Sequence, residues 1–211
     1  MNNKNISAKD GLLIGGFIVL IFLLVIAPEI IPFDPHKQSL NEVLQSPSAA
    51  HFLGTDQYGR DVLARILVGG RVTIGLTLGI TVTIALIGTI LGIMSAYLKG
   101  FISRIITILI NVALAVPSLV FALAIVAVLG GGMGHAALAL ICVAWPKYAR
   151  LARSLTLQVK EAPYIKMARL QGQTKSGIFY HHILPQIAGP LVVTAVLDIG
   201  VILMELAGLS F

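Results

Sequence analysis

The sequence predicts an all-α, polytopic transmembrane helical bundle. Of its 211 residues, 57% are hydrophobic and only 11% are charged, and the mean hydropathy of +0.93 lies outside the range of soluble globular domains. Five apolar segments are long enough, or nearly so, to cross a hydrocarbon core of ~30 Å. No internal repeat is visible, which argues against a secondary transporter built from inverted repeats.

The first 28 residues form a short polar tail and the first predicted span, an apolar run at 11–28. Its apolar core is too long for a cleaved signal peptide and no small-x-small cleavage site follows it, so we expect a membrane anchor. Residues 29–71 are polar, contain several prolines, and carry five acids against four bases. We expect this segment to lie outside the cell.

The remaining residues, 72–211, form the predicted core domain. Its four spans are expected at 72–98, 105–130, 136–157 and 183–211. Pro117 should kink or loosen the third span, because proline removes a helical donor.

Two pairs of glycines on the second span, Gly75 with Gly79 and Gly88 with Gly92, have the spacing that lets helix backbones approach closely. The single cysteine, Cys142, is expected to be a small buried hydrophobe.

Charge counting orients the chain. With a cytoplasmic N-terminus, the inner segments hold eleven of the fifteen basic residues, as the positive-inside rule requires. The net charge of +6 therefore reflects membrane orientation and does not indicate a nucleic-acid partner. Three of these cations, Lys147, Arg150 and Arg153, lie in the second half of the fourth span, where they would snorkel to the inner headgroups or pack within the bundle.

The longest amphipathic interruption is the basic stretch 160–190. A short helix at about 161–172 should start at Ala162-Pro163, because proline is tolerated in the first turn, and stop at Gly172. Pro185 would mark the return to the membrane. Two interpretations compete at this point: a basic loop lying on anionic lipid, and a helix that docks a soluble partner.

Two acids fall inside the last span. Asp198 and Glu205 are seven residues apart and so share a helix face. A carboxylate in hydrocarbon costs ~2.5–3.5 kcal/mol, so it usually faces a water-filled path or a partner. Three roles remain open: contact with a permeant cation, a hydrogen bond or ion pair to another helix, or a position near the outer interface. Asp198, midway along the span, is the better candidate for the path.

Other motifs carry little chemistry. The glycine-rich turn at 130–134 lacks the Gly-Lys-Ser/Thr of a phosphate loop, so we expect no ATP site in this chain. We expect no metal cage either, because the adjacent His181 and His182 diverge by about 100° on a helix. His135, beside Met133, could meet a soft metal in transit, but a solvated turn histidine is the simpler interpretation.

Three segments carry a resemblance to a known family. Residues 53–61, LGTDQYGRD, followed by Leu63, Arg65 and Gly70-Arg71, resemble the external-loop pattern of the peptide/nickel family of ATP-binding-cassette (ABC) importers. The stretch with Lys166-Met167-Ala168, Gly172 and His182-Ile183-Leu184-Pro185 is similar to that family's cytoplasmic motif, and 207–211, AGLSF, to another family segment. The match is to the second, C-type permease subunit. The motif's usual glutamate is Lys166 here and its first alanine is Met167, so no role of that carboxylate carries over.

The resemblance implies a type I importer permease in the cell membrane, with five spans visible and the last transmembrane helix apparently lacking. It implies that two separate ATPase subunits bind ATP and magnesium, that a homologous permease completes the pore, and that this chain is not an enzyme, with no catalytic residue, metal site or cofactor of its own. The residues implied to couple to an ATPase are Tyr164, Ile165, Lys166, Met167, Ala168, Arg169, Leu170 and Gly172. An extracytoplasmic substrate-binding protein would dock on the external segment, at the loop residues Gly54, Thr55, Asp56, Gly59, Arg60 and Asp61.

The substrate predicted first is nickel, as ion or chelate. Leu197-Asp198-Ile199-Gly200 is similar to the nickel branch, and an acid on the path suits a cation. Short peptides are the close alternative, because their ammonium group would meet the same carboxylate. An ion-coupled carrier that works without ATPases, or a truncated structural subunit, remains the alternative from a different class.

Overall fold

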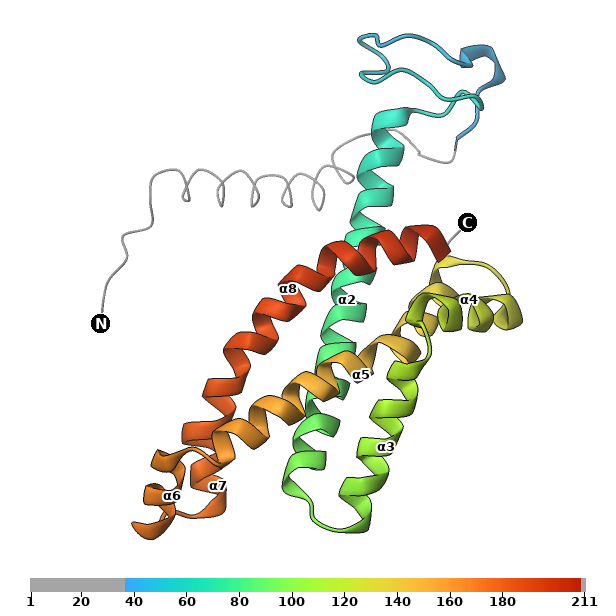
Figure 1. Ribbon diagram of the computed structural model, residues 1–211. Helices are drawn as coiled ribbons and strands as arrows, with labels where there is room; N and C mark the ends of the chain where they lie inside the picture. Colours follow the sequence, from blue (N-terminus) through green and yellow to red (C-terminus); the bar gives the residue numbers. More distant parts are fainter. Residues whose placement is uncertain (1–36, 210–211) are drawn as a thin grey trace. The chain divides into compact units, whose positions relative to one another are not determined.

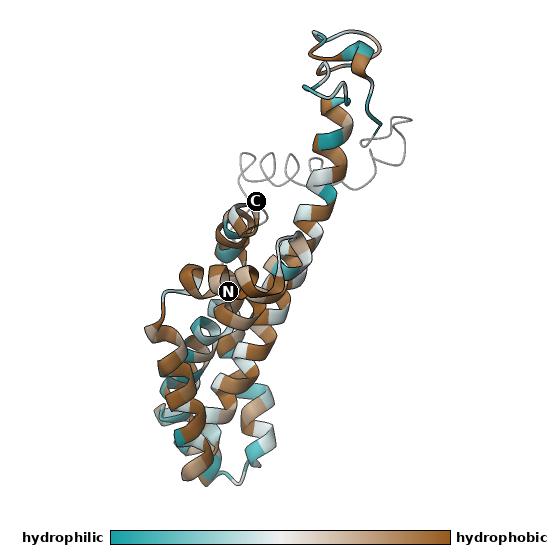
Figure 2. Ribbon diagram, turned by 90° about the vertical axis from the view of Figure 1, so that its right-hand side faces the viewer, coloured by the Kyte–Doolittle hydropathy of each residue, from teal (hydrophilic) through white to brown (hydrophobic). Residues whose placement is uncertain are grey.

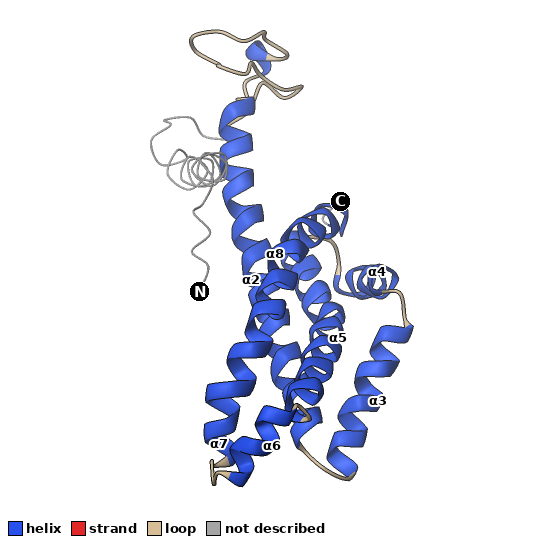
Figure 3. Ribbon diagram, turned by 60° about the vertical axis from the view of Figure 1, so that its left-hand side comes forward, coloured by secondary structure: helices blue, strands red, loops and turns tan. Residues whose placement is uncertain are grey.

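The computed structural model describes residues 37–209, and the predicted first span at 11–28 lies outside them. Within this part of the chain every regular element is a helix, and an isolated bridge between Thr55 and Asp61 is the nearest approach to a strand (Figure 3). The elements are η1 (Leu40–Glu42), α2 (Val62–Tyr97), α3 (Phe101–Ala115), α4 (Ser118–Leu129), α5 (Met133–Lys160), α6 (Pro163–Leu170), α7 (Lys175–Ile178), η2 (Phe179–Ile183) and α8 (Leu184–Leu209) (Figure 1). The predicted all-α class is confirmed.

The chain divides into two compact units, one ending at Gly75 and the other beginning at Leu76. The described part of the first unit contains η1, an irregular loop and the start of α2. This helix begins at Val62, ten residues before the predicted start of the second span at 72, so the last part of the predicted external segment is helical. Asp61 explains the start, because its Oδ1 accepts a hydrogen bond of 2.8 Å from the Ala64 N–H, as an N-cap side chain does.

Two long helical runs of the described residues are apolar enough to cross a membrane, Val62–Tyr97 and Lys175–Leu209, and a bent pair of helices adds a third. The bent pair is α3 and α4, which replace the third predicted span and meet at an angle of 86°. Pro117 lies at the break, and Val116 before it is extended (φ −93°, ψ 132°), as a residue preceding proline prefers. The predicted kink is therefore confirmed, and it is sharp.

Helix α5 is the central helix of the second unit. It packs against α3, α4 and α8 (Figure 1). It buries a series of small side chains that include Ala136, Ala139, Ala149 and Ala152. Its 28 residues would extend about 42 Å, enough to cross a bilayer. It is less apolar than the other long helices because three cations interrupt its second half and Lys160 ends it.

One of the two predicted glycine pairs makes a close helix contact. A Cβ atom at Gly88 would lie 2.4 Å from the Trp145 carbonyl oxygen, and one at Gly92 would lie 2.4 Å from the Ala149 oxygen. Helices α2 and α5 therefore touch backbone to backbone, which only glycine permits. Gly75 and Gly79 have nothing within 4 Å of the same position, so they play no such part within the described chain.

The outer surface of the second unit carries many large apolar side chains. Val128, Leu197 and Met204 are 86%, 71% and 76% exposed, and hydrophobic residues colour the helices along most of their length (Figure 2). Side chains of this kind are stable on an outer surface when lipid surrounds them. Figure 2 thus agrees with a bundle that lies in a membrane.

The last predicted span, 183–211, is preceded by further helix. The chain is helical from Lys175 onward, and it passes through a π-helical turn at η2 before α8. In this turn the Leu184 N–H bonds to the Phe179 carbonyl, five residues back. Pro185 follows directly and has no N–H to continue an ordinary α-helical ladder, so the wider turn admits the proline without ending the helix.

Candidate functional site

Helix α6 is the short helix predicted in the basic stretch. It begins at Pro163 with the extended residue Ala162 before it, and it ends at Leu170. Gly172 takes the left-handed conformation (φ +80°), while the Gln173 N–H bonds to the Ala168 carbonyl at 3.1 Å. That pair of features is the glycine-terminated helix end that the sequence predicts.

The helix has two faces of different character. Ile165 and Ala168 are buried, at 0% and 6% exposure, against the rest of the unit. Tyr164, Met167 and Leu170 recur every three residues and are exposed, Leu170 to 82%. Met167 and Leu170 project from this helix with the partly exposed Tyr164 beside them, an arrangement that fits the groove of a partner protein.

The turn beside α6 is held by side-chain hydrogen bonds. The Tyr164 hydroxyl donates to Gln186 Oε1 on α8 at 2.5 Å, and His182 Nε2 lies 3.0 Å from Gln173 Oε1. His181 Nδ1 lies 3.0 Å from the Gly177 carbonyl oxygen. Both histidines thus contact the local fold, and in the described part of the chain no three His, Cys, Asp or Glu side chains are grouped to hold a metal.

The predicted intramembrane acids line a cavity of about 330 Å³ inside the second unit. Asp198 and Glu205 reach it from α8, Lys147 from α5, and Ser118 from the start of α4, among apolar side chains. Asp198 is only 7% exposed, and its Oδ1 accepts a hydrogen bond of 2.5 Å from Lys147 Nζ. The structure therefore brings both predicted acids to one site and adds a cation to it.

Of the roles left open for Asp198, the ion pair to a neighbouring helix is present. Sequence reasoning missed Lys147 as the partner, having assigned all three cations of this helix to one face near the inner interface. The sequence does contain a signal for this pair: a cation and an acid that both lie inside membrane spans lower the free-energy cost of their burial by pairing. The other two cations contact neighbouring helices: the exposed Arg150 reaches Asn111 Oδ1 on α3 at 3.5 Å, and the partly buried Arg153 donates to the Ser95 carbonyl on α2.

In the first unit, Asp56 is the centre of the predicted external loop. Its Oδ1 accepts from the backbone N–H groups of Tyr58 and Arg60 at 2.8 and 3.0 Å. Its Oδ2 accepts from Arg60 Nε at 2.8 Å and from Arg65 Nη1 at 2.5 Å. Desolvation alone would raise the pKa of the Asp56 carboxyl, but these hydrogen bonds outweigh it and hold the pKa well below its usual range.

The other loop residues named from the sequence also serve the fold of the loop. Gly54 and Gly59 have positive φ, and a Cβ atom at Gly59 would lie 1.8 Å from the Ser39 carbonyl oxygen. The Thr55 hydroxyl donates to the Glu42 carbonyl, and Asp61 caps α2 while its Oδ2 lies 2.9 Å from His51 Nδ1. The residues of the 53–61 motif therefore give the loop before α2 a defined backbone shape.

Comparison with known proteins agrees with this architecture. Residues 88–211 match the sequence model of the family described as binding-protein-dependent transport system inner membrane component. The chain is 34% identical over 206 residues to a dipeptide transport system permease protein of Alkalihalophilus pseudofirmus, covering 96% of this chain and 68% of the relative. It is 41% identical to a dipeptide transport system permease protein of Escherichia coli K12, covering 92% of this chain and 67% of the relative. To the nickel transport system permease protein of the same strain it is 29% identical, covering 86% of this chain and 65% of the relative.

The chain thus spans about two thirds of the length of these relatives. The family match takes in the last ten residues of α2, the bent pair α3–α4, the central helix α5, and the α6–α8 region. The chain therefore belongs to the family of inner-membrane components of binding-protein-dependent transport systems, and within it to the permeases of the peptide and nickel ABC importers.

Proposed function

We propose that this chain is a permease subunit that forms half of the translocation path of an ATP-driven importer for short peptides. The observation that carries the choice of substrate is the Lys147–Asp198 pair beside Glu205 in the cavity of the second unit. A peptide has an ammonium group at one end and a carboxylate at the other. A cavity that presents an amine and two carboxylates can meet both ends.

A bare divalent cation would experience a different field in the same cavity. It would be attracted by Asp198 and Glu205 but repelled by the Lys147 ammonium, which already neutralises Asp198 at 2.5 Å. The prediction of nickel from Asp198 alone did not include this partner. The two dipeptide permeases described above are also more similar to this chain than the nickel permease, at 34% and 41% against 29% identity.

Nickel is the second candidate, supported by the similarity to a nickel permease and by Glu205, a further acid on the cavity wall. A nickel chelate with carboxylate groups would meet Lys147 as a peptide carboxylate does. The two candidates therefore differ in what each requires of the lysine.

The energy for transport would come from separate ATPase subunits, which hold ATP and magnesium. The exposed apolar face of α6, made by Tyr164, Met167 and Leu170, would dock on one of them in the cytoplasm. Closure of two ATPases on ATP would then move α6 and bias the bundle between inward- and outward-facing states. A homologous permease would complete the path, an extracytoplasmic binding protein would deliver the substrate, and the N-terminus of this chain would be cytoplasmic.

Uptake by the complete importer tests the substrate. We expect Lys147→Gln to lower dipeptide uptake while nickel uptake is unchanged or increases, and Asp198→Asn to lower both. Met204→Leu is the matched control, because Met204 is next to Glu205 but is 76% exposed and does not line the cavity. Dipeptide uptake that survives Lys147→Gln, with nickel uptake lost, would reverse the choice of substrate.

Co-purification tests the coupling role. Met167→Glu places a charge on the exposed apolar face of α6, and Met167→Leu keeps that face apolar. We expect Met167→Glu to lower ATPase retention on the order of tenfold, the loss of about 1.4 kcal/mol of interface contact, while Met167→Leu has little effect. Substrate uptake by this chain without any ATPase would instead support an ion-coupled carrier.

A further inference from the structure

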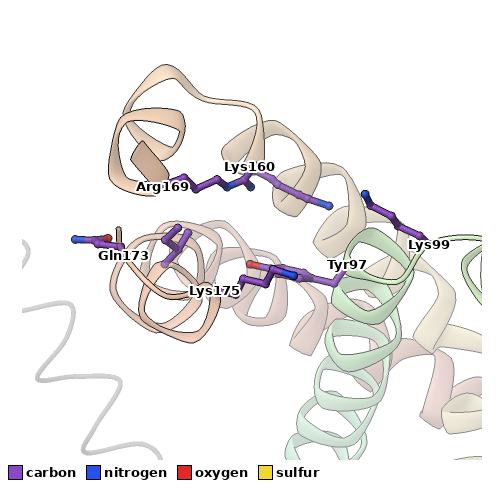
Figure 4. Close-up of a pocket in the computed structure, with 7 residues that line it drawn as sticks. Tyr97, Lys99, Lys160, Arg169, Gln173 and Lys175 are labelled. Carbon is purple, nitrogen blue, oxygen red and sulfur yellow. The ribbon is translucent and has the colours of Figure 1, made fainter. Parts of the chain in front are cut away.

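The second unit has another cavity, of about 390 Å³, at the end where α2 stops and α6 lies (Figure 4). Four cationic side chains line it from four parts of the chain: Lys99 in the turn after α2, Lys160 at the end of α5, Arg169 on α6, and Lys175 at the start of α7. In Figure 4 Lys99 and Lys160 extend toward each other from opposite walls. This cavity lies apart from Lys147 and Asp198, and the transport proposal does not use it.

The charges in this cavity are not balanced by acids. No Asp or Glu lines it, and within residues 37–209 none of Lys99, Arg169 and Lys175 forms an ion pair. Lys160 has neutral partners, the Ala96 carbonyl oxygen at 3.0 Å and the Tyr97 ring at 5.3 Å. Four like charges around one cavity repel one another, and an anion bound inside the cavity offsets this repulsion.

The position of the cavity indicates which anion. Tyr97 lines it and ends a 36-residue apolar helix, as tyrosines do where a span meets the headgroup layer. Ile178 adds an apolar wall. A phosphate has several oxygens to accept hydrogen bonds from lysine and arginine together, and basic pockets between membrane helices bind phospholipid headgroups.

We propose that this cavity is a phosphate-binding site and that its occupant is the headgroup of an anionic phospholipid. The headgroup would link the ends of α2 and α5 to α6 and α7 through charge. Because Arg169 belongs to α6, lipid binding would help to fix the helix that carries the exposed apolar face. The site needs neither substrate nor nucleotide to be filled.

Native mass spectrometry of the purified full chain, with phosphatidylglycerol or phosphatidylcholine added, tests the site. Each cation is worth about fivefold in affinity for an anionic headgroup, so Lys99→Gln with Lys175→Gln should lower phosphatidylglycerol binding about 25-fold. Phosphatidylcholine binding should not change. The matched control is Arg104→Gln, which removes an exposed cation on α3 that does not line the cavity.

Further arms separate the possible outcomes. Lys99→Arg with Lys175→Arg keeps the charge and should restore phosphatidylglycerol binding, which excludes a general folding defect in the glutamine variant. Inorganic phosphate should not displace the lipid. Equal phosphatidylglycerol binding by the parent and the double glutamine variant would overturn the site. Displacement by inorganic phosphate would overturn the lipid assignment in favour of a soluble phosphate, and loss of the lipid when the ATPase binds would overturn it in favour of an ATPase contact.

Discussion

Substitution of Gly88 by alanine tests the backbone contact between α2 and α5. The new Cβ would lie 2.4 Å from the Trp145 carbonyl oxygen and 2.6 Å from Tyr148 Cβ, whereas non-bonded carbons are most stable at about 3.5–4.0 Å. Two of the close atoms are backbone atoms of α5, the Trp145 oxygen and the Ala149 nitrogen, so no side-chain rotation relieves the contact. The helices must separate by about 1 Å, and overpacking of this kind costs about 1–3 kcal/mol.

At about 2–4 °C per kcal/mol for a chain of this size, the melting temperature of Gly88→Ala should fall by about 2–12 °C. The assay is thermal unfolding in detergent, followed by the emission of Trp145, the one tryptophan of the sequence, whose carbonyl is at the contact. Gly79→Ala is the matched control. It makes the same change on the same helix with nothing within 4 Å, and alanine favours the helix.

A double substitution of Gly88 and Gly92 sharpens the test. Both glycines face α5 one turn apart, so a single separation of the helices relieves both contacts, and the double variant should lose less than the sum of the two single losses. Equal melting temperatures for Gly88→Ala and Gly79→Ala would show that α2 and α5 do not touch at these glycines.

Three further predictions concern the loop of the first unit and the anchoring of α6. Gly59→Ala should unfold the loop, because its Cβ would lie 1.8 Å from a backbone oxygen, and faster proteolysis of the loop would show this. Gly172 also has positive φ but has free space around it, so Gly172→Ala should lower the free energy of unfolding by only about 1–2 kcal/mol. The pKa of Asp56 in the folded loop is below its ordinary value, so the ionised carboxylate stabilises the loop above about pH 4. This stabilisation is lost as the pH falls through the lower folded pKa. The resistance of the loop to proteolysis should therefore fall in that range, and it should fall less in Asp56→Asn. Tyr164→Phe removes one hydrogen bond and should cost about 0.5–1.5 kcal/mol in thermal unfolding, and an unchanged melting temperature would show that this bond does not anchor α6.

Features that depend on local chemistry could be predicted from the sequence. The break at Pro117, the start of α6 at Pro163 and its end at Gly172 follow from backbone rules that act within a few residues. The apolar runs likewise predicted the helical membrane class. The start of α2 was placed ten residues late because Arg65, Arg71 and two glycines interrupt the apolar residues of this stretch. The capping role of Asp61 is also invisible without the loop around it.

Contacts between distant segments could not be predicted in the same way. Nothing in the sequence distinguishes the glycine pair that touches α5 from the pair that does not, since both have the same spacing. The partner of Asp198 is 51 residues away on another helix, and the prediction of a cation path treated the acid without it. Cys142 was expected to be buried and is exposed, because apolar character alone does not say which side of α5 the other helices cover.

The separation between Lys147 and Asp198 has a consequence for biogenesis. Helix α5 leaves the ribosome carrying Lys147, Arg150 and Arg153, while the carboxylate that pairs with the lysine is still 51 residues from synthesis. An unpaired cation inside a bilayer costs about 2.5–3.5 kcal/mol, so Lys147 disfavours the release of α5 alone from the translocon into lipid. The insertion machinery should therefore hold α5 until α8 arrives and release the two helices together, with Lys147 and Asp198 paired.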